Sequence, residues 1–216
     1  MNEKSAYRYS DFNEYVERYD NWYERFPIAF ISQSNAFEKI ILKRGLGLEV
    51  GVGTGRFASK LNVPYGIDPA KQSLKLAYQR GVKVISATGE YLPFKDETFE
   101  YLLMVITISF LQNPEQALHE ANRVLKEGGK IIIGMVDKNT FLGKLYREKK
   151  AKGYPFYSKA TFFSPSEVIG SLEKANFENF ETYQTILDLP EKLKNVQHCK
   201  KGYGEGAFVV ICADKR

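Results

Sequence analysis

Residues 46–68 read LGLEVGVGTGRFASKLNVPYGID and decide the fold. Apolar residues 46–50 predict a β-strand, which runs into three alternate glycines, Gly51, Gly53 and Gly55. Glycine tolerates positive φ and lets a ligand approach the backbone without meeting a Cβ atom. The helix predicted after the glycines offers free N–H groups at its first turn. The stretch therefore predicts a strand, a tight turn and a helix, with a ligand bound at the turn.

A second predicted strand, residues 63–67, ends at Asp68. A nucleotide-binding βαβ unit places its ribose-binding carboxylate at about this position. A dinucleotide fingerprint, G-x-G-x-x-G, would begin at Gly51 and Gly53 but would place Arg56 where its third glycine lets helix and strand pack closely. An NAD-dependent oxidoreductase is therefore a weaker interpretation, kept as an alternative.

Glu49-x-Gly51-x-Gly53-x-Gly55 resembles the first motif of the class I S-adenosyl-L-methionine (SAM) dependent methyltransferases. Residues 87–94, ATGEYLPF, resemble the loop that runs past the adenine in this family, and residues 123–130, RVLKEGGK, resemble its entry to the fifth strand. Residues 19–22, YDNW, resemble the amino-terminal segment of its small-molecule members, the UbiE-like or methyltransferase type 11 group. The resemblance covers roughly residues 15–136.

The predicted fold is α/β, a three-layer Rossmann-like sheet of seven strands that is mostly parallel with an antiparallel last strand. The apolar patterns predict these seven strands at residues 46–50, 63–67, 82–85, 101–106, 131–136, 177–187 and 206–213. Helices are expected to end near Pro27 and to span about 32–42, 69–81, 114–125 and 165–175. The helix-free link after residue 187 favours an antiparallel pair of final strands.

We expect one methyltransferase domain over residues 1–216. Its parts are an amino-terminal helical lid (1–45), a SAM-binding core (46–136), an acceptor-side insert (137–164) and the carboxyl-terminal part of the sheet (165–216). The first helix carries an aromatic face that packs on the domain, covers the cofactor, or does both: Phe12, Tyr15, Tyr19, Trp22, Tyr23 and Phe26. The insert carries a second aromatic cluster, interpreted as an acceptor pocket or as the underside of a solvated helix: Tyr154, Phe156, Tyr157, Phe162 and Phe163.

The resemblance implies a role for each end of SAM. On the nucleoside side, Asp68 would accept both ribose hydroxyls, and Thr88, Gly89 and Glu90 would flank the adenine. Thr88 stands where the family often has an acid, and its hydroxyl can also accept a hydrogen bond. The methionine side is implied for Gly51, Gly53, Gly55, Glu49, Thr107, Arg56, Tyr15, Tyr19 and Trp22. Among these, Glu49 would organise the turn or reach the amino group of SAM through water, and Arg56 would pair with the SAM carboxylate. The aromatic residues would close over the methionine end of SAM.

Methyl transfer to a small-molecule acceptor is the activity that the resemblance implies, with S-adenosyl-L-homocysteine (SAH) as product. In-line displacement on a sulfonium needs neither a metal nor a protein nucleophile, and we expect no metal site. His198 is a candidate general base, with a surface histidine as the alternative. Residues 107–110 read TISF, without the Pro-Pro of nucleobase amino methyltransferases or the Pro-Cys of C5 methylation. An amine, a phenol or a quinone-like ring remains as acceptor.

Bulk composition fits this interpretation. The chain has 216 residues, of which 44% are hydrophobic and 26% charged, as in an ordinary globular protein. A net charge of +5 permits a polyanionic partner, so an RNA methyltransferase stays an alternative, although lysines spread along the whole chain disfavour nucleic acid. No apolar run approaches the roughly 20 residues of a membrane span, and a cytoplasmic protein is expected. A non-catalytic SAM-binding module is a further alternative.

Overall fold

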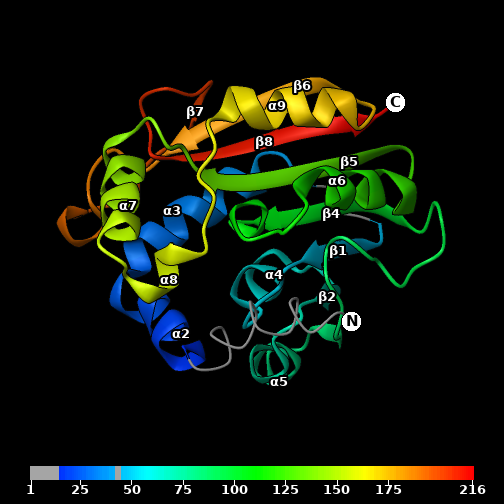
Figure 1. Cartoon of the computed structure of the whole chain (residues 1–216), viewed down its shortest axis with the longest axis horizontal. Helices are drawn as coiled ribbons and strands as arrows, with labels where there is room; N and C mark the ends of the chain where they lie inside the picture. The colour runs from blue at the N-terminus through cyan, green and yellow to red at the C-terminus, as the bar shows by residue number, and fades with distance from the viewer. Residues whose placement is uncertain (1–14, 42–44) are drawn as a thin grey trace.

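A computed structural model describes residues 15–41 and 45–216 of the chain. Its centre is one mixed sheet in the order β3-β2-β1-β4-β5-β8-β6-β7 (Figure 1). The strands are β1 (Gly47–Val50), β2 (Tyr65–Ile67), β3 (Lys83–Ile85), β4 (Phe99–Val105), β5 (Leu125–Val136), β6 (Phe177–Thr185), β7 (Lys200–Lys201) and β8 (Phe208–Lys215). The first five strands pair in parallel, whereas β8 is antiparallel to both β5 and β6.

Helices cover both faces of the sheet, which gives three layers (Figure 1). Along the chain they are α2 (Val16–Arg25), α3 (Pro27–Glu38), α4 (Arg56–Leu61), α5 (Lys71–Gln79), α6 (Pro114–Val124), α7 (Phe141–Ala151), α8 (Pro155–Ser158) and α9 (Pro165–Lys174). Short 3₁₀ turns lie at Thr107–Ser109 and Pro190–Lys192. None of the helices in the described part of the chain is long and apolar enough to cross a membrane.

Each face of the sheet has its own apolar core. Along β5, Ile131 and Ile133 pack in the core that α6 and α9 cover, whereas Ile132 packs in the core of α3, α4 and α5. Such alternation follows from the two-residue period of a strand. Because both faces of the central strands are buried, their sequences are almost continuously apolar, as the run in β4 had predicted.

The predicted α/β fold, its three layers and its antiparallel ending are confirmed, with three corrections. The sheet has eight strands, because β7 adds a short antiparallel partner to β6 at the sheet edge. Helix α3 begins at Pro27, not near residue 32, since proline suits the first helical turn. Strand β5 begins at Leu125, not at residue 131, because Leu125 pairs with Phe99 across an irregularity in the ladder. Phe12 lies outside the described residues.

Candidate active site

A cavity lies at the carboxyl ends of the parallel strands, where open α/β sheets bind ligands. It encloses about 810 Å³, counting the solvent at its mouth. The glycine turn after β1, the end of β2, the loop after β3, the end of β4 and helices α2 and α8 contribute its walls. Eight predicted site residues line it: Tyr15, Tyr19, Gly51, Gly53, Asp68, Thr88, Gly89 and Thr107.

The glycine turn needs its glycines for two reasons. Gly51 and Gly53 have φ values of 71° and 52°, which glycine adopts without strain. A Cβ atom on Gly51 would lie 2.4 Å from Oγ1 of Thr107, whose hydroxyl donates to the Val50 carbonyl at 2.9 Å. Among the described residues, a Cβ atom on Gly53 would meet only a ring carbon of Tyr19, at 3.6 Å. Thr107 therefore supports the turn at Gly51, whereas the turn faces the cavity at Gly53.

Asp68 joins the turn to the end of β2. Its Oδ2 accepts from the Gly53 N–H at 3.0 Å, and its Oδ1 accepts from the Ala70 N–H at 2.7 Å. Enclosure by the protein raises the pKa of this carboxyl to about 6, although both backbone N–H groups act to lower it. Each carboxylate oxygen retains a further lone pair, so Asp68 can still accept hydrogen bonds from a ligand in the cavity.

Glu49 lies behind the turn and is 2% exposed. Burial raises the pKa of its carboxyl well above the usual range, while the Ala58 N–H that donates to it acts to lower that pKa. Its Oε2 has no hydrogen-bond partner among the described residues. A buried oxygen without a partner costs stability, although Glu49 itself does not line the cavity.

The loop after β3 forms another wall. Thr88 and Gly89 line the cavity, and a Cβ atom on Gly89 would lie 3.0 Å from the side chains of Leu111 and Val50. Glu90 does not line the cavity. Its Oε1 accepts from the N–H groups of Gln112 and Asn113, at 2.8 and 3.3 Å. It therefore ties this loop to the segment before α6.

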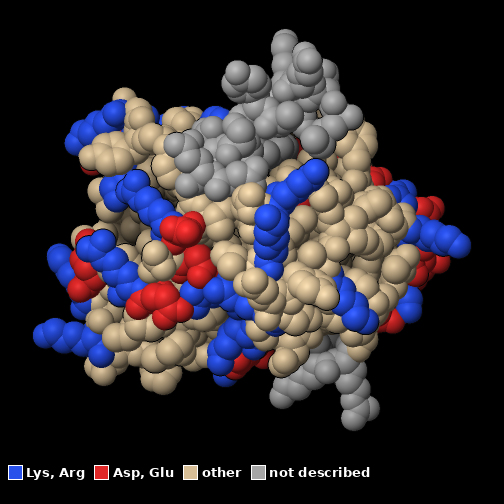
Figure 2. Space-filling model, turned by 90° about the horizontal axis from the view of Figure 1, so that it is seen from below, with Lys and Arg blue, Asp and Glu red and all other residues tan. Residues whose placement is uncertain are grey.

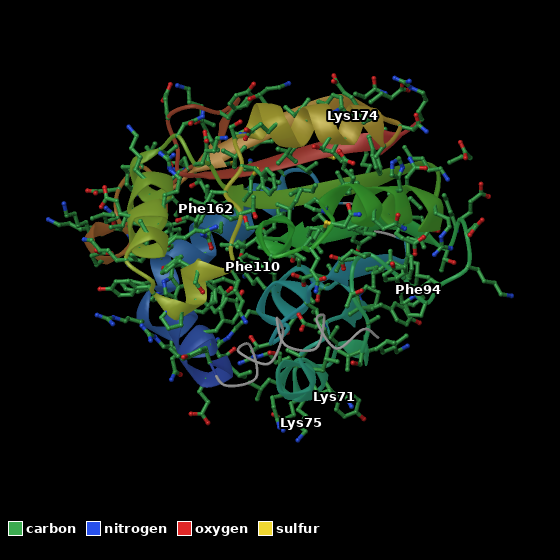
Figure 3. All side chains as sticks on the ribbon, viewed as in Figure 1. Lys71, Lys75, Phe94, Phe110, Phe162 and Lys174 are labelled. Atoms are coloured by element: carbon green, nitrogen blue, oxygen red, sulfur yellow. The ribbon has the colours of Figure 1, made fainter. Side chains whose placement is uncertain are left out.

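Aromatic side chains from distant segments close the remaining side. Tyr19 of α2 stacks on Phe156 of α8, with ring centroids 6.0 Å apart, and Phe110 meets Phe156 edge-on at 5.4 Å. In Figure 3, Phe110 lies beside α8. The hydroxyl of Tyr23 donates to that of Tyr19 at 2.5 Å, and burial raises the pKa of Tyr19 to about 12. Tyr19 therefore stays neutral and in a fixed position on the wall.

Gly55 and Arg56 do not line the cavity. A Cβ atom on Gly55 would lie 2.8 Å from the Ala77 Cα, so this glycine allows the start of α4 to pack against α5. The guanidinium of Arg56 binds the carboxylates of Asp20 and Glu24, at 2.6 and 2.5 Å. The structure thus engages Arg56 with helix α2 and not with the cavity.

Trp22 and His198 also lie away from the cavity walls. Trp22 packs against Tyr23 and Phe26, with ring centroids 5.3 and 5.4 Å apart. It is one turn along α2 from Tyr19 and belongs to the packing end of the aromatic face. His198 is exposed in the segment before β7 and does not contribute to the cavity wall.

Several lining residues had no sequence signal of their own. Val16 and Ser73 are aliphatic or small, and nothing in their local pattern marks them as site residues, whereas Ala87 opens the segment 87–94 that resembles the adenine loop. Phe110 lies in the segment after β4, and ligands in open α/β sheets lie outside the carboxyl ends of the strands. Phe156 belongs to the aromatic cluster of the insert and lines the cavity.

Comparisons with known proteins identify the family. Residues 48–133 match the family model described as a methyltransferase domain. A solved SAM-dependent methyltransferase from Thermotoga maritima, described as a possible histamine N-methyltransferase, is 43% identical and superposes with a TM-score of 0.93 over 97% of this chain and 100% of that one. The chain belongs to the SAM-dependent methyltransferases. SAM, not a nicotinamide nucleotide, is therefore the cofactor of this methyltransferase.

Two further relatives are similar to this methyltransferase over different shares of its length. An uncharacterized protein of Methanocaldococcus jannaschii is 48% identical over 204 residues, which are 94% of this chain and 98% of that protein. The ubiquinone/menaquinone biosynthesis C-methyltransferase UbiE of Hahella chejuensis is 28% identical over 109 residues, which are 50% of this chain and 40% of that protein. The similarity to the second relative is thus partial.

Proposed function

We propose that this methyltransferase transfers the methyl group of SAM to a small-molecule acceptor held against Tyr19, Phe110 and Phe156. The observation that carries the proposal is the shared cavity. Its one side consists of the glycine turn and Asp68, and its other side consists of aromatic rings from α2, α8 and the segment after β4. A cofactor on the first side and an acceptor on the second would meet inside one enclosure.

The cavity residues fit SAM by their chemistry. Asp68 can accept the ribose hydroxyls, and Thr88 and Gly89, which line the cavity in the loop after β3, would flank the adenine. The open backbone at Gly51 and Gly53 would hold the amino acid end, with Thr107 beneath it. The unpartnered Oε2 of Glu49 suits the positive amino group, reached through water. SAM supplies a methyl group that its sulfonium already activates.

The protein contributes position more than chemistry. In-line displacement requires the acceptor atom and the methyl group to be aligned, and effective molarities for well-oriented reactants reach on the order of 10⁵ M or more. Tyr19 and Phe156 stack in a fixed arrangement that can orient a bound acceptor. The same rings exclude water from the reacting atoms.

Aromatic walls favour two kinds of acceptor. They stack on flat rings such as phenols or quinols, and they attract ammonium groups through cation–π contact. The related T. maritima protein is described as a possible histamine N-methyltransferase, and the H. chejuensis protein as a ubiquinone/menaquinone biosynthesis C-methyltransferase. Both classes therefore belong in the acceptor screen, amines first, because the T. maritima protein is similar over its whole length.

An RNA acceptor has less support. Figure 2 shows one face of the molecule, on whose described part lysines and arginines are intermingled with acidic and uncharged residues. Binding to RNA relies on basic surface and weakens steeply with salt. Turnover that persists with small molecules at high salt would argue against an RNA substrate.

Ligand-induced stabilisation tests the cofactor before any acceptor is known. At about 100 times its dissociation constant, SAH is expected to stabilise the protein by about 2.7 kcal/mol, or roughly 5–10 °C in melting temperature for a chain of this size. SAM should act alike, and NAD and NADP should give no shift. A panel of amines, phenols and quinols is then assayed for SAH release. A shift with NAD alone, or SAH binding without turnover on any acceptor, would contradict the proposal.

The raised pKa of Asp68 predicts a pH dependence of cofactor affinity. Only the ionised carboxylate accepts both ribose hydroxyls, and its pKa of about 6 lies above the ordinary 3.8. Affinity for SAH is therefore expected to be constant well above pH 6 and to fall as pH decreases through 6, being about tenfold weaker at about pH 5 than at about pH 7.5. Calorimetry at the two pH values measures this change.

The Asp68→Asn variant is the control for this pH dependence, because its amide does not titrate. Its weaker affinity should be the same at both pH values. In the ligand-free protein the sign is opposite: since the folded pKa lies above the unfolded one, this group lowers the free energy of unfolding as pH rises from about 4 to about 6. Equal pH profiles for the wild type and the variant would show that another group controls binding.

A further inference from the structure

Asp20 on helix α2 is held by two arginines from two other helices. Arg56, the first residue of α4, donates Nε to Oδ1 at 3.0 Å and Nη2 to Oδ2 at 2.6 Å. Arg80, at the end of α5, donates Nη1 to Oδ1 and Nη2 to Oδ2, both at 2.8 Å. Each carboxylate oxygen thus accepts from both guanidinium groups, an arrangement of bidentate, charge-assisted bonds.

The cluster is enclosed and balanced in charge. The side chain of Asp20 is 12% exposed, and those of Arg56 and Arg80 are 18% and 26% exposed. Glu24, one turn further along α2, binds Arg56 at 2.5 Å and supplies the second negative charge. Burial alone would raise the pKa of Asp20, but the hydrogen bonds from Arg56 and Arg80 hold it well below its usual range. The carboxylate is therefore ionised at every working pH.

The same cluster reaches the glycine turn. Besides binding Asp20, Arg80 donates Nη1 to the carbonyl of Thr54, which lies between Gly53 and Gly55, at 2.6 Å. Asp20 also directly follows Tyr19, the residue whose ring lies 3.6 Å from the Cβ position of Gly53. One end of the cluster is thus fixed to the turn, and the other to the helix that places Tyr19 over it.

We propose that Asp20 is a positioning residue that holds α2 over the cavity and so sets Tyr19 against the cofactor. Without its carboxylate, two neighbouring guanidinium groups would face each other with no shared acceptor. Helix α2 would then separate from α4 and α5, and the Tyr19 wall would move with it. The inference rests on the proposed function, in that the cavity is taken as the SAM site.

The chain contains a single tryptophan, Trp22, two residues beyond Asp20 on α2, so its fluorescence reports on this helix alone. In Asp20→Asn we expect SAH to bind five- to tenfold more weakly and to dissociate faster. Trp22 should become more accessible to acrylamide in the free variant, and saturating SAH should restore most of the wild-type quenching. The Asp20→Glu variant keeps the carboxylate and should recover affinity to within about threefold.

Glu24→Gln is the matched control, because Glu24 also binds Arg56 but is 67% exposed and does not bind Arg80. Its SAH affinity and Trp22 quenching should equal those of the wild type. If Asp20→Asn does not fold, Arg80→Lys, which keeps the charge but loses the paired bonds, should show the same changes to a smaller degree.

Each outcome decides the proposal. A lower melting temperature in Asp20→Asn with unchanged SAH affinity and unchanged Trp22 quenching would make the cluster merely structural and overturn the positioning role. An equal loss of affinity in Glu24→Gln would overturn it too, since a general loss of negative charge would then explain the effect. Failure of the wild type to bind SAH would overturn the proposed function itself, and the positioning role with it.

Discussion

Replacement of Asp68 by alanine is expected to weaken SAH binding by about 1–3 kcal/mol, or roughly 5- to 150-fold. The variant removes the proposed acceptor for the ribose hydroxyls. It also removes the acceptor of the Gly53 N–H, which lies 3.0 Å from Oδ2 in the wild type. The turn and the cofactor would therefore lose the same partner. Isothermal calorimetry with SAH at neutral pH measures the change.

The control for Asp68→Ala is a carboxylate outside the cavity. Asp96 binds Arg123 at 2.7 Å and is 74% exposed, so Asp96→Ala removes one negative charge without touching the site. Its affinity for SAH should match that of the wild type. Unchanged affinity in Asp68→Ala would remove Asp68 from the cofactor site, and an equal loss in both variants would point to overall charge.

Among the predicted residues that line the cavity, the local ones follow most directly from the sequence. The turn at Gly51 and Gly53 and the acid Asp68 lie within one strand-turn-helix-strand unit, whose geometry follows from glycine conformation and strand periodicity. The order of the later segments then predicted the sheet. Only the two-residue strand β7, both of whose lysines are exposed, gave no alternation to detect.

Contacts between distant segments were beyond sequence reasoning. The family resemblance implied that Arg56, directly after the glycine turn, pairs with the cofactor carboxylate. In the structure Arg56 binds Asp20, which lies 36 residues earlier in the chain. Arg80, 60 residues after Asp20, binds the same carboxylate. Any arginine near the turn has the charge for either role. Only the packing of α2 on α4 and α5 decides which acid the guanidinium meets.

The aromatic face of α2 shows a similar division. Tyr19 lines the cavity, whereas Trp22, one turn later on the same face, packs against Tyr23 and Phe26. Helical periodicity places both residues on one side of the helix but not at the same depth in the molecule. The aromatic face of α2 therefore lines the cavity at Tyr15 and Tyr19 and packs against other aromatic rings from Trp22 onward.

Gly51→Ala is expected to lower the free energy of unfolding by about 2–5 kcal/mol. A residue with a Cβ atom at a φ of 71° costs about 1–2 kcal/mol, and forcing an atom into a packed site adds about 1–3 kcal/mol. Its Cβ atom would lie 2.4 Å from both Oγ1 and Cγ2 of Thr107, which must move and release the Val50 carbonyl. Chemical denaturation measures the loss, and SAH affinity should fall with it.

Gly81→Ala separates the two costs. Gly81 has a φ of 86°, yet a Cβ atom there would meet no atom of the described part of the chain within 4 Å. This variant should therefore lose only the conformational part, about 1–2 kcal/mol. Thr107→Ala removes the atoms that a Cβ atom on Gly51 would meet first. The Cβ atom of residue 107 stays, 3.0 Å from the added Cβ atom. In that background Gly51→Ala should cost little more than Gly81→Ala, which gives a coupling of about 1–3 kcal/mol between positions 51 and 107. Equal losses for Gly51→Ala and Gly81→Ala in the wild type would mean that Thr107 does not support the turn. Glycine would then be required at position 51 only for its positive φ, and residues other than Thr107 would have to support the turn.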